Sequence, residues 1–183
     1  MLGSFSDLKV NMFDNIKAVV FDLDGTLYNF KGLPLRLMWA LPTDFSRIAN
    51  DRSIRKKLKG CDFGTPEAYK EEYAKRMAKK TALKPADALN WYSNRYIGTM
   101  CFLLKKYYSA RPQLTEVFQM LHSKGIKIAV FSDYPRVKQR VRALDFSDEA
   151  MESISGIYSA EDFGSQKPAL RPFMEIAQQL GVT

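Results

Sequence analysis

Apolar residues occur along the chain either in short continuous runs or at helical spacing. Residues 16–22 form the first continuous run, typical of a strand that is buried on both faces in a parallel sheet. A second run covers 126–131 and ends at Ser132, and a weaker one covers 154–158. These runs predict an α/β protein with a three-layer, Rossmann-like parallel sheet core.

The segment 29–108 carries helix signals and no convincing strand signal. Thr65 supplies a capping hydroxyl and Pro66 suits the first helical position, which together predict a helix over 66–80. Gly125 suits a left-handed cap at the end of a later helix. The remaining helices expected from spacing and proline positions cover 29–44 (a short helix or lid), 85–108, 112–123, 135–144 and 169–180.

The order strand, helices, strand predicts two structural units. We expect a core made of 1–28 and 109–183, and an inserted all-helical unit of 29–108. The strands at 16–22 and 126–131 should be direct, parallel neighbours, because parallel strands need a right-handed crossover connection.

Composition places the chain among ordinary globular proteins. Its 183 residues are 46% hydrophobic and 26% charged. Cys61 and Cys101 lack metal-ligand spacing, so we expect reduced thiols. The start has no signal-peptide pattern and no apolar run reaches membrane-spanning length. The resulting expectation is a cytoplasmic protein with no membrane partner.

The net charge of +8 raises the question of an anionic partner. Basic residues cluster in 52–59, 75–80 and 136–142, and such clusters can attract nucleic acid or a phosphorylated metabolite. Charge runs more commonly form solvated helix faces, and no aromatic-rich nucleic-acid motif accompanies these. We therefore expect no nucleic-acid partner.

Two carboxylates follow the first strand. Asp22 and Asp24 lie where an open parallel sheet places its chemistry, beyond the carboxyl end of a strand, and Gly25 permits a sharp turn. Two nearby acids repel one another, and a cation between them removes that penalty. Oxygen ligands suit Mg²⁺. One carboxylate can attack phosphorus to form an aspartyl-phosphate while the other transfers protons.

An acidic pair of this kind also occurs in calcium loops and in plain surface turns. A calcium loop of the EF-hand type needs Gly at position six and Glu at position twelve, whereas counting from Asp22 gives Leu27 and Leu33. A calcium loop is therefore excluded. A surface turn that happens to carry two acids is the remaining alternative.

Two further residues have phosphate-binding chemistry. Ser132 can donate a hydrogen bond to a phosphoryl oxygen, and Lys167 can hold one by its charge. Helix starts after Pro135 and Pro168 would direct positive dipole ends toward an anion. Considered singly, Ser132 is more often a helix cap and Lys167 a surface lysine. The combination with the acidic pair is more specific.

These motifs together resemble the haloacid dehalogenase-like (HAD) phosphohydrolases. The family's first motif is a hydrophobic strand followed by Asp-x-Asp-Gly-Thr, which residues 22–26 match at each position. Its second motif is a Ser or Thr after the second strand, as at Ser132, and its third is a Lys at a helix start, as at Lys167. Many members insert a helical cap after the first strand, as the helices of 29–108 suggest.

The resemblance implies a Mg²⁺-dependent phosphatase for a small phosphorylated metabolite. Asp22 would be nucleophile and metal ligand. Asp24 would be general acid/base and would bind the metal through its main-chain carbonyl, while Thr26 would support the nucleophile loop. The implied phosphate-binding residues are Thr26, Ser132, Asp133 and Lys167, and our candidates for substrate contacts are Tyr28, Asn29 and the 30–45 lid.

One family motif has no counterpart. The fourth, often Gly-Asp-x-x-x-Asp after a fourth strand, supplies another Mg²⁺ ligand, and the chain ends at residues 180–183, where that strand should begin. We therefore expect a truncated product with weakened Mg²⁺ affinity and activity. The first strand would have an open edge, which the 1–15 arm or a homo-oligomer could cover. A sugar-phosphate mutase and a non-catalytic protein that binds a phosphorylated ligand or a partner remain as alternatives.

Overall fold

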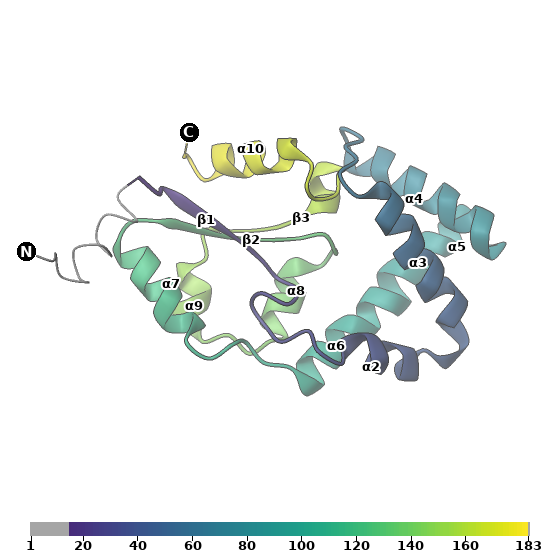
Figure 1. Cartoon of the computed structure of the whole chain (residues 1–183), viewed down its shortest axis with the longest axis horizontal. Helices are drawn as coiled ribbons and strands as arrows, with labels where there is room; N and C mark the ends of the chain where they lie inside the picture. The colour runs from purple at the N-terminus through teal and green to yellow at the C-terminus, as the bar shows by residue number, and fades with distance from the viewer. Residues whose placement is uncertain (1–14, 183) are drawn as a thin grey trace, which may run out of the picture.

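The computed structural model describes residues 15–182, and a three-stranded parallel sheet occupies one half of it, beside a group of helices (Figure 1). The strands are β1 (Ala18–Asp22), β2 (Lys127–Ser132) and β3 (Gly156–Ser159), in the order β1-β2-β3. Val20 of β1 lies opposite Ala129 of β2. The predicted α/β class and the parallel pairing of the first two apolar runs are both confirmed.

Helices cover both faces of this sheet, because alternate residues of β2 point in opposite directions. Ala129 and Phe131 pack with Ile176 of α10 (Leu170–Gln179). Ile128 and Val130 belong to the larger core on the other face, where α7 and α8 pack against β2. Figure 1 shows α10 on one side of the sheet and three further helices opposite, namely α7 (Leu114–Ser123), α8 (Val137–Arg142) and α9 (Asp148–Ser153).

Helices also make up the inserted segment. Its two predicted proline starts are correct: α4 begins at Pro66 with the Thr65 hydroxyl accepting from the Ala68 amide at 3.2 Å, and α5 begins at Pro85. The expected single helix over 85–108 is three consecutive pieces with a π-helical turn in the middle. The segment consists of α2 (Leu33–Ala40), η1 (Pro42–Asp44), α3 (Phe45–Leu58), α4 (Pro66–Thr81), α5 (Pro85–Asn90), η2 (Trp91–Tyr96) and α6 (Ile97–Tyr107).

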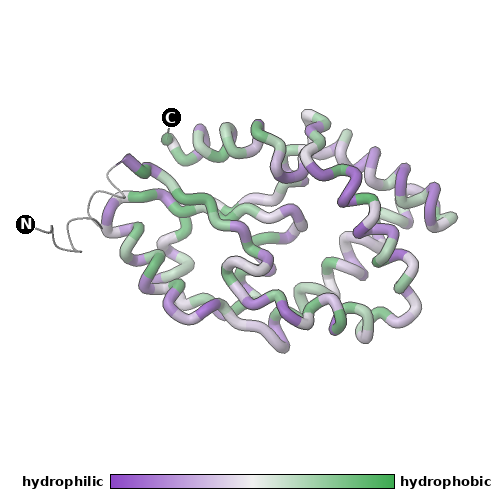
Figure 2. Tube along the Cα trace, viewed as in Figure 1, coloured by the Kyte–Doolittle hydropathy of each residue, from purple (hydrophilic) through white to green (hydrophobic). Residues whose placement is uncertain are grey.

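Helix α3 was not anticipated, and its composition explains why. Its sequence is dominated by polar and charged residues, which Figure 2 shows as hydrophilic stretches along α3 and α4. The buried positions do follow helical spacing, but two of the five are charged, which hides the apolar stripe. They are Ile48, Asp51, Ile54, Arg55 and Leu58.

The chain leaves and re-enters the core at one place. Tyr28 and Ala110 form an isolated antiparallel bridge, and the Arg111 amide donates to the Leu27 carbonyl at 2.9 Å. These contacts hold the start and the end of the helical segment together. The division into a core and an inserted unit remains a prediction, and these contacts lie at its expected boundaries.

Strand β1 lies at one edge of the sheet. Among residues 15–182 its only strand neighbour is β2, and no fourth strand lies beside it. The expectation that the 1–15 arm covers this edge falls almost entirely outside the described residues. None of the helices within that range is long and apolar enough to cross a membrane.

Asp51 on α3 yields a prediction about pH and stability. Its side chain is fully buried, its Oδ1 accepts from the Tyr73 hydroxyl at 2.8 Å, and its Oδ2 has no hydrogen-bond partner within the described chain. Burial raises the pKa of Asp51 although Arg55 and Tyr73 act in the opposite direction. The folded state therefore holds this proton more tightly than the unfolded state does.

The contribution of Asp51 to the free energy of unfolding should consequently fall as the pH rises above about 4, the ordinary pKa of an aspartate, until the folded protein too has lost the proton. In Asp51→Asn this loss should be absent, so the free energy of unfolding of the variant should rise relative to that of the wild type between pH 4 and pH 7. Urea unfolding across that range measures the difference. A difference that is constant with pH would contradict the prediction.

Candidate active site

Asp22 and Lys167 meet at the carboxyl end of the sheet. Asp22 is the last residue of β1, and its Oδ1 accepts a hydrogen bond from the Lys167 ammonium. The same ammonium donates to the Phe131 carbonyl of β2 at 3.2 Å. The side chains of Asp22 and Lys167 are 40% and 21% exposed, so a ligand can reach both. The structure therefore brings two of the candidate site residues into contact.

Asp133 fixes the backbone of the lysine. Its Oδ1 accepts from the Lys167 amide at 2.9 Å. The Lys167 carbonyl accepts from the Gly60 amide at 3.1 Å, so the helical segment also contacts this loop. The predicted role of Asp133 in binding phosphate stays a prediction. In the structure its carboxylate ties the loop after β2 to the loop that carries Lys167.

Asp24 lies beside Asp22 in a different environment. The Tyr28 hydroxyl donates to its Oδ1 at 2.6 Å and the Ser132 hydroxyl donates to its Oδ2 at 2.9 Å. The Arg140 guanidinium donates to Oδ1 as well, forming an ion pair. Asp24 and Ser132, two of the predicted site residues, are therefore in direct contact.

The ion pair determines the charge of Asp24. Burial alone would raise the pKa of this carboxyl, but the Arg140 charge and hydrogen bonds from Arg140, Tyr28 and Ser132 outweigh burial and lower it. Burial, together with the negative charge of Asp24, raises the pKa of Tyr28, which therefore remains a donor. At neutral pH Asp24 is thus an ionised carboxylate that can accept a proton.

Arg140 was missed by the sequence analysis, which treated its segment as a solvated basic face. Its side chain is completely buried, and besides Asp24 it donates to the Ser132 hydroxyl at 3.0 Å. Its Nε has no hydrogen-bond partner among residues 15–182. The signal that could have revealed it is helical spacing, because Arg140 lies on the same face as buried apolar residues. These are Val137, Val141 and Leu144.

The loop after Asp24 is held through its main chain. Arg111 donates to the Gly25 carbonyl at 2.9 Å and to the Thr26 carbonyl at 2.8 Å. Gly25 has a φ of 87°, which a side chain would strain. The Thr26 hydroxyl makes no hydrogen bond within the described structure, so the contribution of Thr26 to this loop comes from its carbonyl.

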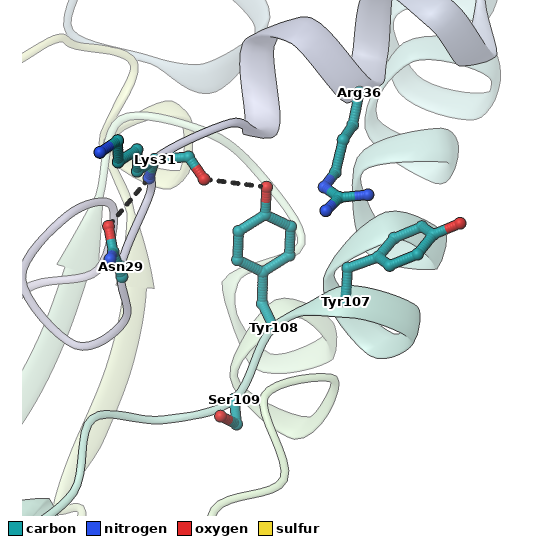
Figure 3. A pocket seen from close by; sticks show the side chains of 6 residues that line it. All are labelled: Asn29, Lys31, Arg36, Tyr107, Tyr108 and Ser109. Atoms are coloured by element: carbon teal, nitrogen blue, oxygen red, sulfur yellow. Dashed lines mark hydrogen bonds between the residues drawn. The ribbon is translucent and has the colours of Figure 1, made fainter.

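The two candidate substrate residues lie in different places. Tyr28 is fully buried and its hydroxyl is bound to Asp24. Asn29 lies at the rim of a hollow of about 280 Å³ beside the helical segment. Figure 3 shows the Arg36 guanidinium directed into the space beside Tyr108, while the Lys31 ammonium points away from it.

The oxygen atoms at the end of β1 match part of a magnesium site. Oδ2 of Asp22 and the main-chain carbonyl of Asp24 accept no hydrogen bond from the described residues, and both are the hard donors that Mg²⁺ prefers. The Asp24 carboxylate is occupied by Arg140, Tyr28 and Ser132. Within residues 15–182 no cluster of three or more His, Cys, Asp or Glu side chains is arranged to hold a metal. The residues present therefore fit a site with few protein ligands.

Comparison with known proteins identifies the family. Residues 16–183 match the family model of the haloacid dehalogenase-like hydrolases. Because the match covers nearly the whole chain, the protein belongs to this hydrolase family, as the motifs suggested.

Individual relatives are more distant. The chain is 25% identical to the phosphoglycolate phosphatase of Salmonella typhi over 187 residues, covering 95% of this chain and 73% of that protein. Its structure resembles CbbY from Rhodobacter sphaeroides in complex with phosphate, with a TM-score of 0.57 and 21% identity over 91% of this chain and 73% of that one. It also resembles a putative β-phosphoglucomutase from Thermotoga maritima, with a TM-score of 0.52 and 20% identity over 92% and 72%. These structural likenesses show the shared fold.

Proposed function

We propose that this hydrolase is a Mg²⁺-dependent phosphatase acting on a small phosphate monoester through an aspartyl-phosphate on Asp22. The observation that carries the proposal is the contact between Asp22 and Lys167 at the ends of β1 and β2, within reach of solvent. A carboxylate nucleophile paired with a cation suits attack on an anionic phosphoryl group. Phosphoglycolate is the first substrate to test, because the relative in Salmonella typhi is a phosphoglycolate phosphatase.

In the first step a carboxylate oxygen of Asp22 attacks phosphorus, and the bond from phosphorus to the leaving oxygen breaks. The Lys167 ammonium offsets the negative charge of the Asp22 carboxylate before attack. It can then stabilise the negative charge on the phosphoryl oxygens in the transition state. Magnesium held by the Asp22 carboxylate and the Asp24 carbonyl would supply further positive charge to the phosphoryl group. The alkoxide that leaves takes up a proton from solvent water and departs as an alcohol, because the ionised Asp24 has no proton to donate.

In the second step water attacks the phosphorus of the aspartyl-phosphate and releases inorganic phosphate, restoring the Asp22 carboxylate. The water must lose a proton, and Asp24 is the candidate acceptor because it is already ionised. Its hydrogen bond from Ser132 and its ion pair with Arg140 fix the direction in which the carboxylate faces.

An assay of phosphate release from a panel of phosphorylated metabolites, with and without Mg²⁺, tests this function. Release from one member or a few, dependent on Mg²⁺, is the expected result. An isomerised substrate without free phosphate would instead indicate a mutase. Thermal stabilisation by a ligand with no turnover would indicate a non-catalytic binding protein.

Replacing Lys167 should slow turnover more than it weakens folding. In Lys167→Met the proposed site loses the cation that pairs with Asp22, and we expect kcat to fall by about 10²–10³-fold. The pair with Asp22 is partly exposed, so its loss should change stability little. Steady-state kinetics beside a thermal melt measure both effects, and Lys138→Met on the exposed side of α8 is the matched control. Unchanged kcat would contradict the assignment of Lys167.

A further inference from the structure

Arg55 is a buried arginine of the helical segment that the mechanism above does not use. It lies on α3 and is 8% exposed. Its Nη1 donates to the hydroxyls of Tyr92 at 2.8 Å and Tyr69 at 3.3 Å, both within the helical segment. Its Nη2 leaves that segment and donates to the main-chain carbonyl of Asp133, the residue after Ser132.

Further contacts join Arg55 to the core loops. Its guanidinium lies 4.1 Å from the centroid of the Tyr134 ring, in the loop after β2. Its Nη1 lies 3.8 Å from Oε1 of Glu161, in the turn η3 (Ala160–Phe163) after β3. The Tyr92 hydroxyl donates to the same Glu161 oxygen at 2.8 Å. One side chain of the helical segment therefore contacts the segments that follow both β2 and β3.

Two separate routes connect Arg55 to Lys167. In the first, Asp133 accepts from Arg55 with its carbonyl and from the Lys167 amide with its carboxylate, the latter at 2.9 Å. In the second, the Tyr69 hydroxyl accepts from Arg55 and from the side-chain amide of Gln166, at 2.8 Å. Gln166 directly precedes Lys167 in the chain. Both routes end on the main chain that carries the catalytic ammonium.

Stability alone does not explain why an arginine occupies this buried position. Removing a guanidinium from water costs free energy that its partners only partly return, and replacing a whole buried ion pair by apolar residues is often neutral or stabilising, although removing one partner alone is costly. Arginine offers five donors in a rigid fork, so it can hold a carbonyl, two hydroxyls and a carboxylate at fixed relative positions. Neither lysine nor an apolar residue can do this.

We propose that Arg55 is a positioning residue that holds the loops after β2 and β3 so that Ser132 and Lys167 face the reacting phosphoryl group. The inference rests on the proposed phosphatase function for its kinetic consequence. Its structural consequence, the ordering of both loops by a residue of the helical segment, is independent of turnover. In this arrangement α3 sets the geometry of the residues that bind the phosphoryl group.

The test compares Arg55→Met and Arg55→Lys with Arg52→Met, an exposed arginine one turn earlier on the same helix. We expect both Arg55 variants to lose about 10–100-fold in kcat with a smaller change in KM, since misplacing catalytic groups affects the reaction step most. Arg55→Lys should not restore kcat, because lysine keeps the positive charge but lacks the planar guanidinium that binds several partners at once. Arg52→Met should match the wild type.

Hydrogen exchange followed by mass spectrometry supplies a readout that needs no activity. In Arg55→Met, peptides covering 132–135 and 163–168 should exchange faster, while peptides from α7 should not change. Exchange that increases only within α3 and α4, or an unchanged kcat, would overturn the proposal. If Arg55→Met does not fold, Tyr69→Phe removes the second route alone and should loosen 163–168. A wild type without phosphatase activity would refute the proposed function, and the exchange result would still decide the positioning role.

Discussion

Asp22→Asn is expected to abolish phosphate release while leaving the fold intact. An asparagine has nearly the shape of the aspartate but cannot act as the attacking carboxylate, so the aspartyl-phosphate cannot form. We expect a loss of roughly 10³-fold or more in kcat, as is usual when a nucleophile is removed. The Asp22 side chain is 40% exposed, so losing its pair with Lys167 should change the melting temperature little.

Two further variants sharpen this experiment. Asp22→Glu keeps the charge but moves the carboxylate by one methylene, and a displacement of that size should still cost about 10²-fold. Asp145→Asn is a suitable control, because it removes an exposed carboxylate at a left-handed position that asparagine tolerates. Full activity of Asp22→Asn on a substrate that the wild type hydrolyses would show that another group attacks phosphorus.

The sheet could be predicted because it depends on apolar patterning, whereas Lys167 was identified from its charge and from the resemblance to the family's third motif. Residues of β2 are buried from Ile128 onward, so the strand reads as a continuous apolar run with a polar residue at its end. Parallel strands bring their carboxyl ends to one edge, which places Asp22 and Ser132 close together without knowledge of the loops. The predicted starts at Pro66 and Pro85 were correct for a similarly local reason.

The charged groups inside the protein could not be predicted in the same way. Arg140 and Arg55 occur in basic stretches, and a sequence pattern treats such stretches as solvated surfaces. Their burial depends on partners more than 70 positions away, Asp24 for Arg140 and the Asp133 carbonyl for Arg55. Helix α3 was overlooked for the same reason, since two of its buried positions carry charge.

These buried arginines give the candidate site its electrostatic character. Asp22 is exposed and meets a lysine, a cation on a flexible stem, whereas Asp24 is largely buried and meets an arginine with fixed geometry. The two neighbouring carboxylates therefore have different roles available to them. Under the proposed mechanism, Asp22 is the carboxylate that is accessible for attack, and Asp24 is the ionised carboxylate held in a fixed direction to accept a proton.

The pair between Asp24 and Arg140 should have the largest effect on stability. Arg140 is fully buried and the Asp24 side chain is 16% exposed, so Arg140→Met would leave a mostly buried carboxylate without its cation. Removing one partner of such a pair costs about 3–5 kcal/mol. For a chain of this size that corresponds to a fall in melting temperature of about 10 °C. Thermal and urea unfolding of the variant measure the loss.

The double variant Asp24→Asn with Arg140→Met separates the charge effect from packing. The asparagine carbonyl can still accept from the Tyr28 hydroxyl, and its NH2 group can donate to the Ser132 hydroxyl. No uncompensated charge remains in the double variant, so much of the stability lost in Arg140→Met should return. Asp24→Asn alone should be destabilised, because it leaves the buried guanidinium unpaired. The four proteins form a double-mutant cycle whose coupling energy should exceed about 1 kcal/mol. Additive losses would show that Arg140 contributes packing alone and that the charge of Asp24 adds nothing to the pair.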